Sequence, residues 1–141
     1  MTTREDIVNE ARKWLGVRWV HQGRTRNGID CAGLVACVGK DLGLITYDTT
    51  DYQRRPDHSK FTQYFESGGG IRKNVKDAAP GDVMIFREKS FPCHTAIVST
   101  MYGQPAMIHA FVLRKMVVEE LIDDNWAAKR VACFQYPNLG G

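Results

Sequence analysis

The chain has 141 residues, of which 43% are hydrophobic and 25% charged, and its formal net charge is +3. This length supports a single core, so residues 1–141 are interpreted as one domain. The charge is too small to select a class of partner, and no basic run is interleaved with aromatic residues. Nucleic-acid binding is therefore not expected. Membrane insertion is not expected either, because no segment approaches the roughly 20 apolar residues that span a bilayer.

The first residues show helical periodicity, without the basic, apolar and small-residue regions of a signal peptide. We therefore expect the chain to begin in the cytoplasm. Without an export signal or a CxxC pair, neither a disulfide framework nor a structural zinc site is expected. The four cysteines are then buried small side chains or reactive thiols: Cys31, Cys37, Cys93 and Cys133.

Helical periodicity dominates the first third of the chain. A first helix is predicted over residues 4–15, with Thr3 as its N-cap, because apolar residues recur there at helical spacing. Residues 17–29 have the composition of a loop, and a second helix is predicted over 31–42. A short third helix is predicted around 59–66, before a run of glycines.

After a turn signal at residues 79–82, the period of the apolar residues changes to that of strands. Five strands are predicted, over 83–86, 95–100, 106–111, 115–121 and 131–136. Helices come first and an antiparallel sheet second. This order predicts an α+β domain with helices packed on a sheet of about five strands.

Cys31 stands where the predicted loop becomes the second helix. The first N–H groups of a helix have no intrahelical partner, and the helix dipole places positive potential at the same end. Both effects stabilise a thiolate, and the same N–H groups can bind an oxyanion. The segment alone leaves a buried structural cysteine equally open. Asp30 is an N-cap candidate, and Gly33 would let another element approach the first turn closely.

A cysteine nucleophile needs a base, and the chain has four histidines. His58 lies among polar residues and is interpreted as a solvated surface side chain. His94 opens the second predicted strand and His109 lies within the third. If these strands form a hairpin whose loop has an even number of residues, the numbers of two paired residues always sum to an odd number. The numbers 94 and 109 also sum to an odd number. Both rings then share one face of the sheet, although a histidine in a strand is more commonly structural.

Four segments in this order resemble the sequence blocks of NlpC/P60 cysteine peptidases. Residues 28–35, GIDCAGLV, resemble the block with the nucleophile, and residues 80–83, PGDV, resemble the block that opens the sheet. Residues 94–98, HTAIV, resemble the block with the catalytic histidine, and residues 107–110, MIHA, the block with the third catalytic residue. The resemblance implies a papain-like fold and a triad of Cys31, His94 and His109. It implies no cofactor and no metal.

Residues 16–24 and 51–56 look like the phage-tail and gene-transfer-agent branch of this family. The resemblance implies a tail-tip enzyme whose partners are peptidoglycan stem peptides and tail-hub proteins. Such an enzyme is assembled in the cytoplasm without a signal peptide. The particle then carries it to the cell wall or periplasm of the target cell.

Other residues near the nucleophile are candidates for oxyanion or substrate contacts. Trp19 stands where many relatives have tyrosine, and its indole can donate but not accept a hydrogen bond. Ala32 replaces the usual serine but keeps its backbone N–H. His21 and Arg24 are expected at the rim of the cleft, where Arg24 is either a ligand for a stem carboxylate or a solvated surface residue. By alternation along its strand, Cys93 is expected to face away from Cys31.

The expected reaction is hydrolysis of an amide bond in a peptidoglycan stem peptide. By resemblance, this is the bond from γ-D-glutamate to diaminopimelate or lysine. Two alternatives remain open at this point. One is a structural tail-hub protein with a vestigial peptidase fold, and the other is an acyltransferase or amidase on the same scaffold.

Overall fold

The computed structural model describes residues 1–52, 58–87 and 93–140. Four α-helices, one 3-10 helix and eight strands lie within these residues. In chain order they are α1 (Arg4–Arg12), β1 (Arg24–Thr25), β2 (Gly28–Ile29), α2 (Cys31–Asp41), α3 (His58–Ser67), β3 (Ile71–Lys73), η1 (Val75–Asp77), β4 (Val83–Phe86), β5 (His94–Met101), β6 (Gln104–Phe111), β7 (Met116–Leu121), α4 (Asp124–Ala127) and β8 (Arg130–Gln135). None of the described helices is long and apolar enough to cross a membrane.

Six strands form one antiparallel sheet in the order β3-β8-β4-β5-β6-β7. The five predicted strands are all present, and the predicted α+β class is confirmed. The sixth strand, β3, was not predicted because it has only three residues, two of them basic. Its pairing with β8, which lies far along the chain, stabilises it. A segment this short has no periodicity of its own to reveal it.

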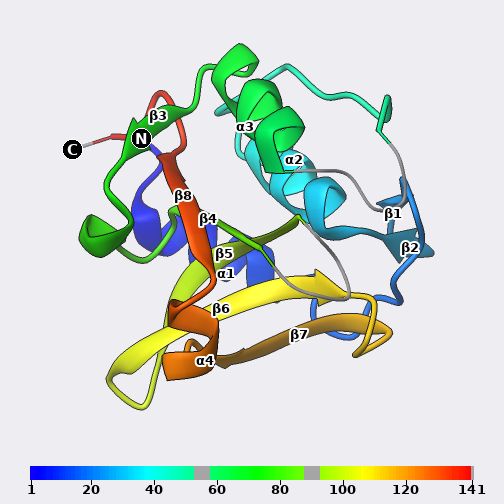
Figure 1. The fold of residues 1–141 in the computed structure, drawn as a ribbon. Helices are drawn as coiled ribbons and strands as arrows, with labels where there is room; N and C mark the ends of the chain where they lie inside the picture. Colours follow the sequence, from blue (N-terminus) through cyan, green and yellow to red (C-terminus); the bar gives the residue numbers. More distant parts are fainter. Residues whose placement is uncertain (53–57, 88–92, 141) are drawn as a thin grey trace.

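The sheet carries a separate apolar cluster on each face. The first cluster joins α1 and α2 to the sheet and includes Ile7, Leu34, Ile85, Ile97 and Ile108. The second lies toward α4 and includes Met84, Phe86, Val98, Met107, Phe111 and Trp126. Figure 1 shows α2 and α3 on one side of β6 and α4 on the other. Side chains therefore alternate between two buried environments along β5 and β6, so neither strand has a solvent face at its centre.

The first two helices begin as their sequences predict. Thr3 accepts a hydrogen bond from the Asp6 amide, and the Asp6 carboxylate accepts one from the Thr3 amide, which completes a capping box. At the start of α2, the Asp30 side chain accepts from the amide of Gly33. Both helices are thereby fixed at their N-terminal ends, and Cys31 becomes the first residue of α2.

Residues 17–29 are more ordered than the predicted loop. They contain the small antiparallel pair of β1 and β2, and Trp19 forms an isolated bridge with Ile29. A Cβ atom at Gly33 would lie 2.3 Å from the carbonyl oxygen of Gly23, so only glycine fits there. The expected close approach to the first turn of α2 is therefore confirmed, and it presses the hairpin against this turn.

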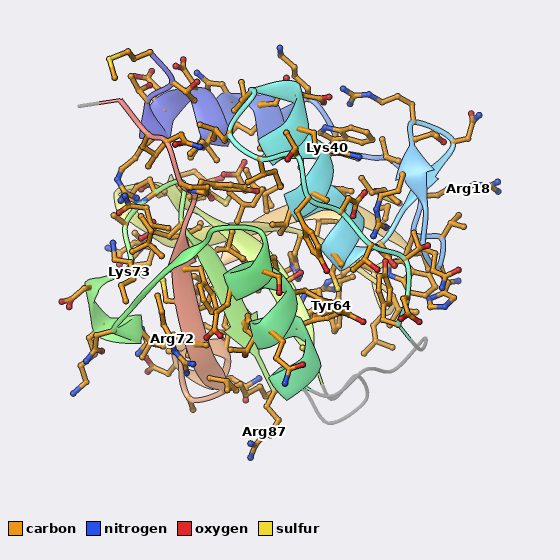
Figure 2. All side chains as sticks on the ribbon, turned by 90° about the horizontal axis from the view of Figure 1, so that it is seen from above. Arg18, Lys40, Tyr64, Arg72, Lys73 and Arg87 are labelled. Carbon is orange, nitrogen blue, oxygen red and sulfur yellow. The ribbon has the colours of Figure 1, made fainter. Side chains whose placement is uncertain are left out.

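Three exposed arginines lie far apart on the molecule. In Figure 2, Arg18, Arg72 and Arg87 point outward from three different parts of the molecule. Each is exposed, and the Arg72 guanidinium lies 3.7 Å from the Glu66 carboxylate. These three arginines do not combine into one basic surface.

Candidate functional site around Cys31, His94 and His109

Cys31 occupies the N-terminus of α2, as predicted, and is only 3% exposed. Its pKa is raised to about 12, first because the thiol is buried and second because the Asp30 carboxylate is beside it. Groups of Thr95 and the Ala32 backbone oppose this rise. The expectation of a lowered pKa is therefore wrong for this structure, because burial and a neighbouring negative charge outweigh the helix terminus. The resting side chain is a thiol.

The Asp30 carboxylate is the centre of a buried hydrogen-bond network. It accepts bonds from the Gly33 amide at 2.8 Å, the Gln22 amide at 2.7 Å and the Tyr52 hydroxyl at 2.6 Å. A fourth comes from Arg24 at 3.1 Å. Asp30 is 2% exposed, so these bonds replace its hydration. The N-cap prediction is confirmed, and an ionised carboxylate has no proton to donate to an oxyanion.

Arg24 lies inside this network rather than at a solvated rim. Its side chain is 15% exposed and forms ion pairs with Asp30 and Asp48, both at 3.1 Å. Its other hydrogen bonds go to the backbone oxygens of Gly23 and Thr49. The interpretation as a solvated surface arginine is therefore wrong. All three guanidinium nitrogens already donate hydrogen bonds within the protein, so the structure does not present Arg24 to a substrate carboxylate.

His94 and His109 share one face of the sheet, as their spacing predicts. The loop between β5 and β6 has two residues, and Val98 pairs with Met107, so paired positions sum to an odd number. His94 Nε2 lies 2.6 Å from His109 Nδ1, which is a short hydrogen bond. The two side chains are 1% and 0% exposed.

Aromatic rings enclose the histidine pair. Phe111 and Trp126 lie with their centroids between 4.8 and 5.9 Å from both imidazole rings, and Phe86 lies 6.4 Å from His94. Burial, and secondarily the neighbouring His109, lower the pKa of His94 well below its usual value. His94 is therefore a neutral imidazole at pH 7, and the resting site is a thiol with an uncharged base.

Cys31 reaches β5 at the residue that follows His94. Thr95 acts on the thiol through its backbone and its hydroxyl, both of which favour the thiolate. The pairing of β5 with β6 extends only to Ile97, so β5 continues toward His94 paired with β4 alone. No hydrogen bond between Cys31 and His94 is present among the described residues. The structure thus brings the thiol next to the strand of its predicted base without joining the two groups.

Cys93 does not face away from Cys31, contrary to the prediction from alternation. Both thiols belong to the apolar cluster beneath the helices. The His94 ring instead contacts Phe111 and Trp126 of the other cluster. The alternation itself holds, but the odd-numbered residues at the start of β5 face α2. The prediction had assigned that face to His94.

The remaining predicted residues surround the start of α2. Trp19 is half-buried beside the first cluster, and its amide donates to the oxygen of Lys115. Ala32 is half-buried and contributes its backbone to Cys31. His21 packs edge-on against Tyr52, with ring centroids 5.8 Å apart. These residues lie near the nucleophile, and their contacts with a substrate remain a prediction.

An apolar cavity of about 60 Å³ lies behind α2, next to the site. Its walls include Ala32, Val35, Tyr52, Phe61, Tyr64 and Phe134. The Tyr64 hydroxyl donates to the Asp51 carbonyl oxygen, and Figure 2 shows Tyr64 on the inner side of α3. A charged stem peptide would lose its hydration in such walls, so we do not place the peptide here. Among the described residues no group of three or more His, Cys, Asp or Glu could hold a metal ion.

Two contributors were missed by the sequence analysis. Tyr52 binds the Asp30 carboxylate from a segment without clear periodicity, so no sequence signal pointed to it. Glu120 lies 3.7 Å from His109 Nε2, measured to its Oε1 atom. A signal for Glu120 did exist, because the loop between β6 and β7 has four residues and 109 and 120 sum to an odd number. The parity argument applied to His94 would have found it.

Comparisons with known proteins agree with this fold. The NlpC/P60 family model matches residues 16–135. The chain is 29% identical to the gamma-DL-glutamyl hydrolase of Bacillus subtilis over 94% of its own length and 29% of that protein's. It is 24% identical to the murein DD-endopeptidase MepS/murein LD-carboxypeptidase of Escherichia coli K12, over 85% of the chain and 56% of that protein. The chain thus spans about half or less of the length of these relatives.

A solved structure gives the same result. The NlpC/p60 domain of the peptidoglycan hydrolase SagA superposes with a TM-score of 0.66 at 22% identity, covering 95% of this chain and 99% of that one. At this level of identity the match shows the fold. The predicted NlpC/P60 architecture is confirmed by it and by the family model.

Proposed function

The chain belongs to the NlpC/P60 family, and we propose that it is a cysteine peptidase that hydrolyses amide bonds of peptidoglycan stem peptides. The observation that carries this proposal is local. The thiol at the N-terminus of α2 lies against β5 at Thr95, and the preceding residue, His94, is hydrogen-bonded to His109. A nucleophile, a base and an orienting group are the three parts that such chemistry needs.

The resting pair is neutral, so the reaction begins with proton transfer rather than with a preformed thiolate. His94 Nε2 is engaged with His109, so Nδ1 is the nitrogen that serves Cys31. As the Cys31 sulfur attacks the amide carbon, its proton passes to Nδ1. The His94 ring contacts Phe111 and Trp126 on the α4 side of the sheet, whereas Cys31 lies on the α2 side. The proposed transfer therefore requires the start of β5 to turn the His94 ring toward Cys31 in the substrate complex.

The remaining steps use the same groups. The carbonyl oxygen becomes an oxyanion, which accepts hydrogen bonds from backbone N–H groups at the start of α2. The C–N bond breaks, and the leaving amine takes the proton from His94. Water then attacks the thioester carbon, giving one proton back to His94, and the Cys31 thiol is restored as the carboxylic acid leaves. Within this scheme, Asp30 holds the loop and the helix terminus in place.

The bond that we propose is the one that follows γ-D-glutamate in the stem, toward diaminopimelate or lysine. Support comes from the sequence blocks around Cys31 and from a relative whose name is gamma-DL-glutamyl hydrolase. The particle context is also a proposal. Residues 16–24 support a phage-tail or gene-transfer-agent enzyme that meets tail-hub proteins and acts in the wall of the target cell. The other segment behind that proposal, 51–56, lies mostly outside the described residues.

The direct test is incubation of the purified chain with peptidoglycan sacculi, followed by mass spectrometry of the soluble fragments. We expect new termini at γ-D-glutamate, and we expect Cys31→Ala to release none. Cys37→Ala is the matched control on the same helix and should still release fragments. Activity that survives in Cys31→Ala would sink the proposal, and another bond in the fragments would correct its substrate.

One observation favours a second candidate, a structural protein that keeps the fold without turnover. Cys31, His94 and His109 are almost completely buried, at 3%, 1% and 0% exposure. Alkylation by iodoacetamide with and without sacculi separates the two functions. In an enzyme whose cleft opens on substrate, sacculi should change the alkylation rate of Cys31, either by covering the thiol or by exposing it. In a structural protein, Cys31 should react no faster than Cys37 under either condition.

A further inference from the structure

A carboxylate completes a chain that begins at His94 and continues through His109. Glu120 on β7 places Oε1 3.7 Å from His109 Nε2. That nitrogen is buried and has no hydrogen-bond partner within normal geometry. The other oxygen of Glu120 accepts from Arg114 Nε at 3.2 Å. Glu120 is therefore held at its position from the solvent side while it faces the buried histidine.

The charge of Glu120 distinguishes the two tautomers of His109. If the proton of His109 were on Nδ1, the Nε2 lone pair would face a carboxylate oxygen, which is repulsive. With the proton on Nε2, the N–H dipole points at the carboxylate instead. The Nδ1 atom of His109 then accepts, and the short contact of 2.6 Å requires that His94 donate from Nε2. A neutral His94 with its proton on Nε2 has a lone pair on Nδ1.

We propose that Glu120 is a positioning residue that sets the tautomers of both histidines and thereby prepares Nδ1 of His94 to accept a proton. The catalytic consequence rests on the proposed peptidase function, whereas the tautomers do not. When His94 takes the Cys31 proton, the imidazolium donates to His109 and the carboxylate lies at the far end of the chain. The Glu120 charge then stabilises the cation through His109.

The surroundings contain few competing charges. Among the described residues, the charged groups near the pair are Glu120 on β7 and Arg114 on the turn before it, with Lys129 Nζ 5.1 Å from the ring centroid of Trp126. The groups from β4, β6 and α4 that contact the rings are Phe86, Phe111 and Trp126, which do not titrate. In agreement, the adjacent His109 ring is the main cause that lowers the pKa of Glu120, against the effect of burial. The carboxylate thus stays ionised at neutral pH.

The neighbouring Glu119 provides a matched control. It faces the helices, where it pairs with Arg12 at 2.9 Å and accepts from Ser99 at 2.9 Å. Glu119→Gln and Glu120→Gln therefore remove the same charge from adjacent residues on opposite faces of β7. Only the second change reaches the histidines.

The first measurement is long-range ¹H–¹⁵N NMR of the imidazole rings at pH 7, with signals assigned through His94→Gln and His109→Gln. We expect wild-type His109 to carry its proton on Nε2, and Glu120→Gln to populate the Nδ1–H form. Glu119→Gln should leave the spectrum unchanged. A wild-type His109 protonated on Nδ1 overturns the proposal, as does an unchanged tautomer in Glu120→Gln. If Glu120→Gln does not fold, the tautomer of His109 in the wild type and in Glu120→Asp tests the proposal.

The second measurement is the pH profile of kcat/KM on a soluble muropeptide. We expect Glu120→Gln to lower kcat about 10- to 100-fold with little change in KM, and to move the acid limb to lower pH. Glu120→Asp, which keeps the charge, should recover part of the loss. An acid limb that stays in place with full kcat contradicts the catalytic role. A wild-type chain that hydrolyses nothing refutes the proposed function, while the NMR result still decides the tautomers.

Discussion

The two polar networks of the site differ in how completely their groups are paired. Around Asp30, one carboxylate accepts four hydrogen bonds, and its partners come from the hairpin, from α2 and from the segment that follows it. In the histidine network, a short hydrogen bond joins His94 Nε2 to His109 Nδ1, and His109 Nε2 lies 3.7 Å from the Glu120 carboxylate, beyond normal hydrogen-bond distance. A saturated network fixes the position of the nucleophile. The second network leaves one buried nitrogen of His109 without a normal hydrogen bond.

The largest effect should come from the histidine network. We expect His94→Gln to reduce kcat/KM on a muropeptide by about 1000-fold, because general-base catalysis contributes on this scale. Thermal unfolding should show that the variant remains folded, since a buried neutral amide replaces a buried neutral ring. Loss of less than threefold would mean that another group accepts the Cys31 proton.

Changes in the Asp30 network should instead lower the stability of the fold. Asp30→Ala removes the N-cap of α2 and leaves buried donors of Arg24 and Tyr52 without their acceptor. We expect a loss of about 3 kcal/mol in the free energy of unfolding by urea. Asp6→Ala, at the capping box of α1, should lose about 1 kcal/mol. If the two variants lost the same stability, the hydrogen bonds of Asp30 would contribute no more than an ordinary N-cap.

A smaller loss is expected when the same carboxylate loses only one donor. Tyr52→Phe keeps the ring and its contacts with Phe61 but removes a hydroxyl 2.6 Å from Asp30. We expect about 2 kcal/mol of lost stability, the usual contribution of a buried hydrogen bond to a charged group. Urea unfolding checks it, and an unchanged midpoint would show that water replaces the hydroxyl.

The smallest effect is a pH dependence that arises from the histidine network. The pKa of folded His94 lies well below that of the unfolded chain, so the unfolded state binds one more proton between the two values. Stability is then complete above about pH 7 and falls as the pH drops through about 6.5. Between pH 7.5 and 5.5 we expect a loss of about 1.4 kcal/mol. His94→Gln should remove this component of the slope, and an unchanged slope would contradict the burial of a neutral ring.

Much of the fold could be predicted from the sequence because its signals are local. Thr3 and Asp6 form a capping box at a recognisable spacing, and the parity of 94 and 109 predicts that the two histidines share a face. These properties depend on a few neighbouring residues or on one hairpin. They do not depend on how the rest of the chain packs.

The site was less predictable because its properties depend on packing. The thiol pKa of Cys31 follows from burial beneath the sheet, which no spacing in the sequence reveals. The position of Arg24 follows from Asp48, which a poorly periodic segment brings back to the hairpin. The face that His94 occupies depends on whether odd or even residues of β5 meet α2, and alternation alone leaves this choice open.

The central claim is that Cys31 is the nucleophile, and the most direct test is kcat/KM of three proteins on one muropeptide that contains the γ-D-glutamyl bond. These are the wild type, Cys31→Ser and Cys37→Ser. Each variant replaces one sulfur atom of α2 by oxygen. We predict that Cys31→Ser loses at least about 1000-fold and that Cys37→Ser stays within a few-fold of the wild type. Equal activity in Cys31→Ser and the wild type would contradict the account.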